Sequence, residues 1–94
     1  MTFYGLLPIG TVVLIGDSEK RVMIVGVCQR SGDDGEIWDY TGVLYPEGYL
    51  DSDTMFLFNN DQISKVFAMG YQDEEQFEFK DRADATIKSL REEK

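Results

Sequence analysis

The first 71 residues alternate short apolar runs with polar turns, which is the pattern of a β-rich domain. The runs are rich in valine and isoleucine, whose branched side chains suit a pleated sheet. Gly26 and Gly70 fall inside two of the runs and predict bulges or sharp bends there. The five predicted strands span residues 10–16, 21–29, 37–45, 55–58 and 63–71.

The remainder of the chain changes to a helical pattern, which predicts one helix over about residues 74–91. Four apolar residues recur there at spacings of four, four and three, so they fall on one helical stripe. Acidic residues at 73–75 suit the positive end of the helix dipole, and either Asp73 or Asp81 can cap the helix. The stripe consists of Phe79, Ala83, Ile87 and Leu90.

Strands followed by a helix are typical of an α+β domain with an antiparallel sheet. We therefore predict about five strands, arranged as an antiparallel meander or as a small SH3-like half-barrel, with one C-terminal helix. Residues 1–94 are expected to form a single domain, because a chain of 94 residues cannot enclose two independent cores.

The amino-acid composition excludes several classes of functional site. The chain has 18 acidic and 9 basic residues, a formal net charge of −9, no histidine and one cysteine. Without histidine there is no cysteine–histidine zinc site and no histidine-activated nucleophile, and one cysteine cannot form an intrachain disulfide. No phosphate-binding glycine motif occurs either. We therefore predict a protein that is not an enzyme, with no catalytic residues, no metal and no cofactor.

The acidic charge and the scattered basic residues argue against nucleic acid and against anionic membranes as partners. No apolar run approaches the ~20 residues that span a bilayer, and no signal-peptide pattern opens the chain. Cys28 is expected to be a buried structural thiol in a reducing compartment. These observations predict a cytoplasmic protein that binds other proteins, although the same charge also serves solubility.

Two acidic turns invite a calcium interpretation, at residues 33–36 and 51–53. A calcium-binding helix-loop-helix needs alternating oxygen ligands, a central glycine and a glutamate at loop position twelve. Neither segment has that order, so we expect solvated turns.

Aromatic residues are abundant, with one tryptophan, five tyrosines and six phenylalanines. Phe56, Phe58 and Phe67 are predicted to fill the core. A second group clusters around the third strand and the loop that leaves it. Tyrosine and tryptophan either pack within a sheet or anchor a protein interface, and both interpretations stay open at this point. The candidate partner-binding residues are Trp38, Tyr40, Tyr45, Pro46, Glu47 and Tyr49.

An open sheet also has two free edges, and either can accept a strand from a partner or from a second copy. Phe77 lies off the helical stripe and offers a further docking point, unless it covers the core.

Several strings in the chain are distinctive together. Tyr-Pro-Glu-Gly at 45–48 follows the strand Asp-Tyr-Thr-Gly at 39–42, with Leu-Pro-Ile-Gly at 7–10 and Gly-Tyr-Gln-Asp-Glu-Glu at 70–75. This combination resembles a family of small acidic proteins of Gram-positive bacteria. Their genes lie in type VII (WXG-type) secretion loci, beside LXG-toxin genes. The resemblance extends from about residue 7 to residue 79, and Gln76 interrupts the run of acids typical of the family.

The resemblance implies a cytoplasmic accessory protein that binds an LXG toxin as its chaperone before export. An immunity protein that neutralises the cognate toxin is the alternative. The family provides no agreed binding motif to transfer to this chain. We expect a monomer or a weak homodimer. The remaining hypotheses are a small enzyme or ligand-binding barrel, and a structural homodimer paired through sheet edges.

Overall fold

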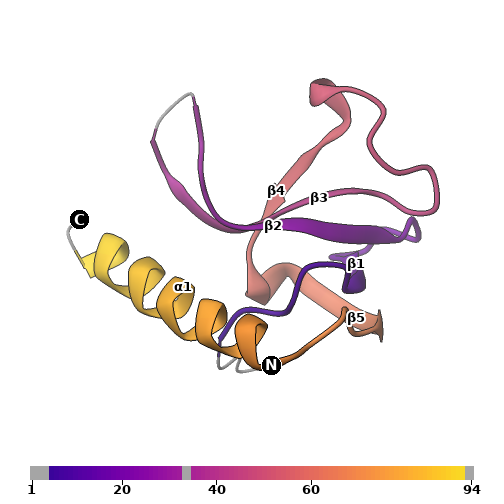
Figure 1. The fold of residues 1–94 in the computed structure, drawn as a ribbon. Helices are drawn as coiled ribbons and strands as arrows, with labels where there is room; N and C mark the ends of the chain where they lie inside the picture. Colours follow the sequence, from indigo (N-terminus) through magenta and orange to yellow (C-terminus); the bar gives the residue numbers. More distant parts are fainter. Residues whose placement is uncertain (1–4, 33–34, 93–94) are drawn as a thin grey trace.

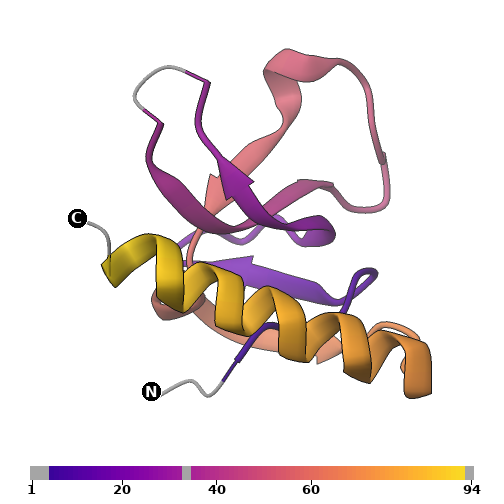
Figure 2. The ribbon, with the colours of Figure 1, turned by 60° about the vertical axis from the view of Figure 1, so that its left-hand side comes forward.

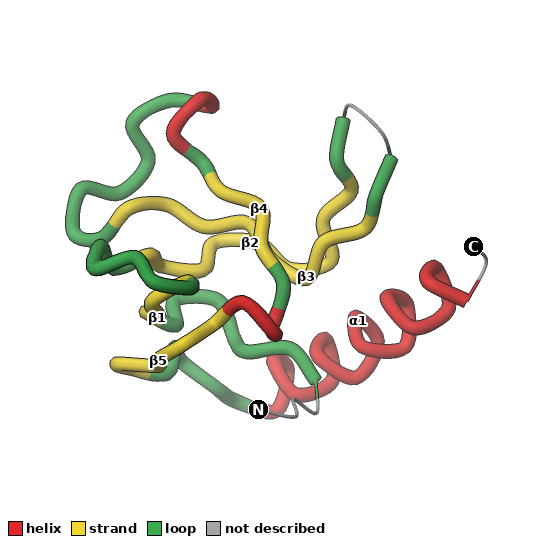
Figure 3. Tube along the Cα trace, turned by 180° about the vertical axis from the view of Figure 1, so that it is seen from behind, coloured by secondary structure: helices red, strands yellow, loops and turns green. Residues whose placement is uncertain are grey.

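The computed structural model describes residues 5–32 and 35–92 (Figure 1). Strands come first and the helix last, and a long loop separates the third and fourth strands (Figure 3). The elements are β1 (Val12–Ile15), β2 (Val22–Arg30), β3 (Ile37–Leu44), the 3-10 helix η1 (Ser52–Thr54), β4 (Phe56–Phe58), the 3-10 helix η2 (Asn60–Gln62), β5 (Ile63–Ala68) and α1 (Glu74–Glu92).

The five strands form one open antiparallel sheet in the order β4-β3-β2-β1-β5. The first four strands form a meander, and β5 then returns to pair with β1 on its far side. The predicted α+β fold, a five-stranded antiparallel sheet with one C-terminal helix, is therefore confirmed. The edges of the sheet are β4 and β5, since each pairs with a single neighbour.

Strand β2 is irregular in its middle. Its pairing with β3 shifts register between Ile24 and Gly26, which confirms the predicted bulge. A Cβ on Gly26 would lie 2.7 Å from Thr41 Cγ2, so only glycine fits there without a shift. Two residues on, Cys28 has a φ of 55°, a left-handed conformation that is uncommon outside glycine. The β2–β3 hairpin curves away from the rest of the sheet beyond this point (Figure 1).

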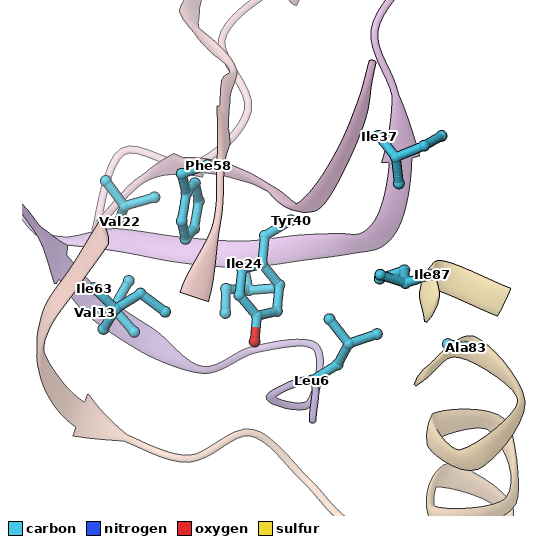
Figure 4. Packing of buried hydrophobic residues seen from close by; sticks show 10 residues of the cluster. All are labelled: Leu6, Val13, Val22, Ile24, Ile37, Tyr40, Phe58, Ile63, Ala83 and Ile87. Carbon is cyan, nitrogen blue, oxygen red and sulfur yellow. The ribbon is translucent and has the colours of Figure 1, made fainter. Parts of the chain in front are cut away.

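The core lies between one face of the sheet, the segment before β1 and helix α1 (Figures 2 and 4). Tyr40 and Phe58 are its largest fully buried side chains, with ring centroids 5.3 Å apart. Gly42 leaves space for Phe58 and Val22, because a Cβ at position 42 would lie too close to both side chains. The cluster comprises Leu6, Val13, Val22, Ile24, Ile37, Tyr40, Phe58, Ile63, Ala83 and Ile87.

Two of the phenylalanines predicted to fill the core do not. Phe58 is buried, but Phe56 is 40% and Phe67 46% exposed. Phe56 lies on the edge strand β4, which has no neighbour on its other side. Phe67 lies on the other edge strand, beneath the ammonium of Lys65, whose Nζ is 4.8 Å from its ring centroid. Both rings therefore lie on edge strands, but edge position alone does not expose a ring, because Phe58 at the end of β4 is buried.

Helix α1 begins directly after Asp73, whose carboxylate accepts a hydrogen bond of 2.9 Å from the backbone N–H of Gln76. Of the two predicted caps, Asp73 is therefore the one used. Ala83 and Ile87 are buried and Leu90 is half-buried, as the stripe predicts. Phe79 departs from the prediction, because its side chain is about half exposed on the first turns of the helix.

The chain after β5 crosses very close to the segment before β1. A Cβ on Gly70 would overlap the carbonyl oxygen of Ile9, so the two backbones are in direct contact. The N–H of Gly70 donates to Thr11 Oγ1 (3.0 Å), and that buried hydroxyl donates to the carbonyl of Pro8 (2.8 Å). Strand β5 accordingly ends at Ala68, and Gly70 marks a backbone crossing rather than the expected bulge.

The packing of α1 predicts that Ile87→Ala lowers the free energy of unfolding by about 2–4 kcal/mol, through lost burial and a cavity. Ser89→Ala, on an exposed position of the same helix, should change it by less than about 0.5 kcal/mol. Urea unfolding monitored by circular dichroism measures both variants. Equal stability of the two would mean that α1 does not pack as described.

The crossing at Gly70 predicts that Gly70→Ala destabilises the fold by at least about 1–3 kcal/mol, because the backbones must separate. Gly32→Ala is the matched control, since a Cβ there meets no atom within 4 Å. Thermal unfolding compares the two variants. A melting temperature for Gly70→Ala equal to that of the control would contradict the crossing.

Candidate protein-binding surface

Tyr40 is not available to a partner, which corrects one of the predicted partner-binding residues. Its side chain is fully buried between the sheet and the segment before β1 (Figure 4). The hydroxyl accepts a hydrogen bond of 2.8 Å from the N–H of Leu7 and donates to the side-chain oxygen of Asn60. Burial raises the pKa of Tyr40 far above its ordinary value, so the neutral phenol is the form present.

Trp38 is half-buried on β3, where it pairs with Gln29 of β2. Tyr40, two residues further along β3, is buried, so the two rings do not form one exposed patch.

The loop between β3 and β4 does expose large apolar side chains. Tyr49 is 65% and Leu50 57% exposed, and Tyr45 is exposed at the start of the loop. The edge strand β4 adds Phe56 and Leu57, which pair with Gly42 and Thr41 of β3 and are also exposed. Phe56 and Leu57 are consecutive strand residues, so they lie on opposite faces of β4. Exposed apolar residues concentrated in one stretch of the chain are candidates for protein interaction. We call this set, Tyr45, Tyr49, Leu50, Phe56 and Leu57, the loop surface.

Local contacts hold the first half of this loop in place. The Tyr45–Pro46 peptide bond is cis, and the N–H of Gly48 donates to the carbonyl of Leu44 (2.7 Å). Gly48 has a φ of 80°, which glycine adopts without strain. The guanidinium of Arg21 lies 5.1 Å from the ring centroid of Tyr45. Tyr45 is therefore presented on a structured turn, and Tyr49 and Leu50 follow directly after it.

Glu47 forms an ion pair with Lys20. Its carboxylate accepts hydrogen bonds from Lys20 Nζ, with both oxygens at 2.7 Å. This bond from Lys20 lowers the pKa of Glu47 below its ordinary value. Both side chains are well exposed, so the ion pair contributes little to stability, and a partner can compete for either charge.

The acidic turn at residues 51–53 has a structural role. One carboxylate oxygen of Asp51 accepts hydrogen bonds from the N–H groups of Asp53 (2.9 Å) and Thr54 (3.1 Å), which caps η1. The corresponding residues of the other predicted turn, Asp33 and Asp34, lie outside the described residues. Among the residues that the structure does describe, no three acidic or cysteine side chains gather as a metal site would require.

A groove with a mixed polar and apolar lining lies between the C-terminal half of α1 and η2, with a volume of about 640 Å³. Sequence patterns did not reveal it, because its residues come from distant parts of the chain. The buried carboxylate of Asp39 lies 3.0 Å from Arg91 Nη2 and accepts from the N–H of Asn60 (2.8 Å). Opposite them, Asp84 accepts from the N–H of Leu6 (2.9 Å). These polar groups satisfy one another, so we interpret the groove as structural.

The structure gives little support for Cys28 as a catalytic nucleophile. Cys28 is half-buried, and burial raises the pKa of its thiol, the reverse of what an activated nucleophile needs. Within residues 5–32 and 35–92, no helix combines the length and apolar character needed to cross a membrane.

A family model matches residues 6–79 of the chain, which includes every strand and the first turns of α1. The chain belongs to the family described as Domain of unknown function (DUF4176). The match spans almost the same residues as the sequence resemblance. Neither the comparison with curated proteins nor the comparison with solved structures gives a match.

The two tyrosines Tyr40 and Tyr49 should respond differently to loss of their hydroxyl groups. Tyr40→Phe leaves the N–H of Leu7 and the side-chain oxygen of Asn60 without their partner, so it should destabilise this DUF4176 domain by about 1–3 kcal/mol. Tyr49→Phe should change stability by less than about 0.5 kcal/mol. Chemical denaturation measures both. If Tyr40→Phe left the stability unchanged, Tyr40 would again be a candidate partner-binding residue.

Proposed function

We propose that this DUF4176 protein is a non-enzymatic module that binds another protein. The observation that supports this most directly is the loop surface, where large apolar side chains stay exposed on the β3–β4 loop and an edge strand. Tyrosine is among the residues most often found at the energetic centre of protein interfaces. Exposed apolar side chains on a small domain favour association with another protein, because association removes apolar area from water.

The partner that we propose is an LXG toxin, with the protein acting as its chaperone in the cytoplasm before export. The resemblance to accessory proteins of type VII secretion loci is the support for this identification. The formal charge of −9 adds a physical reason, because it speeds association with a basic partner and keeps the free protein soluble. A chaperone of this kind covers apolar surface on the toxin until export begins.

The alternative is an immunity protein, which would cover the toxin's active site. Acidic charge favours this alternative when the toxin is itself basic, as nucleases are. The two functions predict the same partner, but they differ in whether binding abolishes toxicity.

A direct test is to measure the affinity of the purified protein for the LXG toxin encoded in its own locus. The variant Tyr49→Ser with Leu50→Ser should bind at least about tenfold more weakly, because two exposed anchors are lost. Phe77→Ser is the control, because Phe77 is similarly exposed but lies on α1. Both variants should keep the melting temperature of the wild type. Undiminished binding by the loop variant would rule out the loop surface as the docking site.

The two functions separate when the toxin is produced in the cytosol. A chaperone should raise the amounts of soluble and exported toxin while cells remain sensitive to it. An immunity protein should restore growth without raising export. If the toxin did not bind at all, both the chaperone function and the immunity function would be refuted.

A further inference from the structure

A second apolar surface lies at the start of α1, away from the loop surface. Phe79 and Ile9 are each about half exposed and line the same small crevice, with a volume of about 30 Å³. Pro8, Val27 and Ala83 complete its apolar walls. Gly70, which contacts Ile9, is flanked by Met69 and Tyr71, two further exposed apolar side chains. In Figures 1, 2 and 3 the β3–β4 loop lies above the sheet and α1 lies below it.

One polar group in this crevice lacks a partner. Gln76 lines the crevice, and its side-chain oxygen is buried with no hydrogen bond. A buried acceptor left unpaired costs free energy, but this oxygen is too deeply buried for a bound segment to reach it directly. The crevice therefore offers a ligand a small, almost wholly apolar contact surface.

The start of α1, beside the crevice, carries an excess of acidic residues. Lys80 lines the crevice, but its ammonium is paired with Asp84 (2.6 Å). Residues 73–79 contain four carboxylates: Asp73, Glu74, Glu75 and Glu78. All four are exposed, and none forms an ion pair with another described residue. Two of them, with Phe79 and Arg82, line a second hollow beside Phe79. Acids in a first turn stabilise a helix, but Glu78 lies beyond that turn. The excess negative charge makes this surface complementary to a basic ligand.

We propose that the surface formed by Ile9, Gln76, Phe79 and the acids around them, the Phe79 surface, binds a basic amphipathic segment of a partner protein. An apolar side chain of that segment would pack against Ile9 and Phe79 at the mouth of the crevice. Its lysine or arginine residues would lie along Glu75 and Glu78. Because this surface is separate from the loop surface, a basic segment can bind it whether or not the partner is an LXG toxin.

The probe is a synthetic helical peptide of about 18 residues with leucines on one face and lysines on the other. Isothermal titration calorimetry measures its affinity, and backbone amide shifts in NMR spectra locate the site. Shifts should centre on Ile9, Gln76 and Phe79. A peptide of equal charge with serine in place of leucine should bind at least about tenfold more weakly, as should a leucine–glutamate peptide.

The helix supplies a matched control for the apolar contact. Phe77 and Phe79 are 51% and 48% exposed, but they lie about 200° apart around the helix. Phe79→Ser should weaken binding of the leucine–lysine peptide about tenfold, whereas Phe77→Ser should change it by less than about twofold. Their melting temperatures show whether both variants fold. Equal effects of the two would overturn the proposal.

The charge contribution has its own control. Glu75→Lys and Glu19→Lys change the net charge equally, but Glu19 lies in the turn between β1 and β2. Glu75→Lys should reduce affinity several-fold more than Glu19→Lys, and the difference should shrink as salt increases. Equal losses would mean that the peptide follows net charge alone, which would refute a specific site.

Other occupants of the Phe79 surface give distinguishable results. If the occupant is a second copy of this chain, size-exclusion chromatography with light scattering should show a dimer that Phe79→Ser dissociates. That outcome would contradict a basic segment as the ligand. Loss of toxin binding in the Tyr49 and Leu50 variant, with unchanged peptide binding, would leave this proposal intact.

Discussion

Burial of the Tyr40 hydroxyl ties three distant parts of the chain together. The phenol reaches from the centre of β3 to the N–H of Leu7 before β1 and to the amide of Asn60 in η2. Asn60 in turn donates from its side chain to the carbonyl of Gly5 (3.3 Å). A buried hydroxyl without partners would cost free energy, so these contacts must form together. The position of the N-terminal segment under the sheet depends on them.

A second polar connection attaches the end of α1 to the same region. The carboxylate of Asp39, next to Tyr40 on β3, lies 3.0 Å from Arg91 on the last turn of the helix. Arg91 also donates to the side-chain oxygen of Asn59 (3.2 Å). Asp39 is buried and Arg91 is partly exposed, so the guanidinium shields a charge that would otherwise be unpaired in the core. The pair therefore supports the docking of α1 that begins with Ala83 and Ile87.

With these contacts fixing the interior, the apolar residues left outside fall into separate surfaces. The loop surface lies on the β3–β4 side, and the Phe79 surface lies where α1 begins. The edge strand β5 is less suited to pairing with a partner. Its register with β1 shifts twice, and Lys65 lies over Phe67. Strand addition at the β5 edge is therefore disfavoured, whereas the β4 edge has neither feature.

Local sequence signals alone determined the α+β fold and the bulge at Gly26, and they narrowed the helix cap to Asp73 or Asp81, because residue spacing, turn chemistry and capping act within a few residues. The absence of histidine likewise excluded whole classes of chemistry, since no folding of the chain can supply an imidazole that it lacks. Only the tertiary structure decided that Tyr40 is buried while Tyr49 is exposed. Both are tyrosines in or beside strand β3, and their local preferences are the same. Their burial differs because α1 and the N-terminal segment cover one face of the sheet and leave the β3–β4 edge open. Which face is covered depends on contacts between residues far apart in the chain.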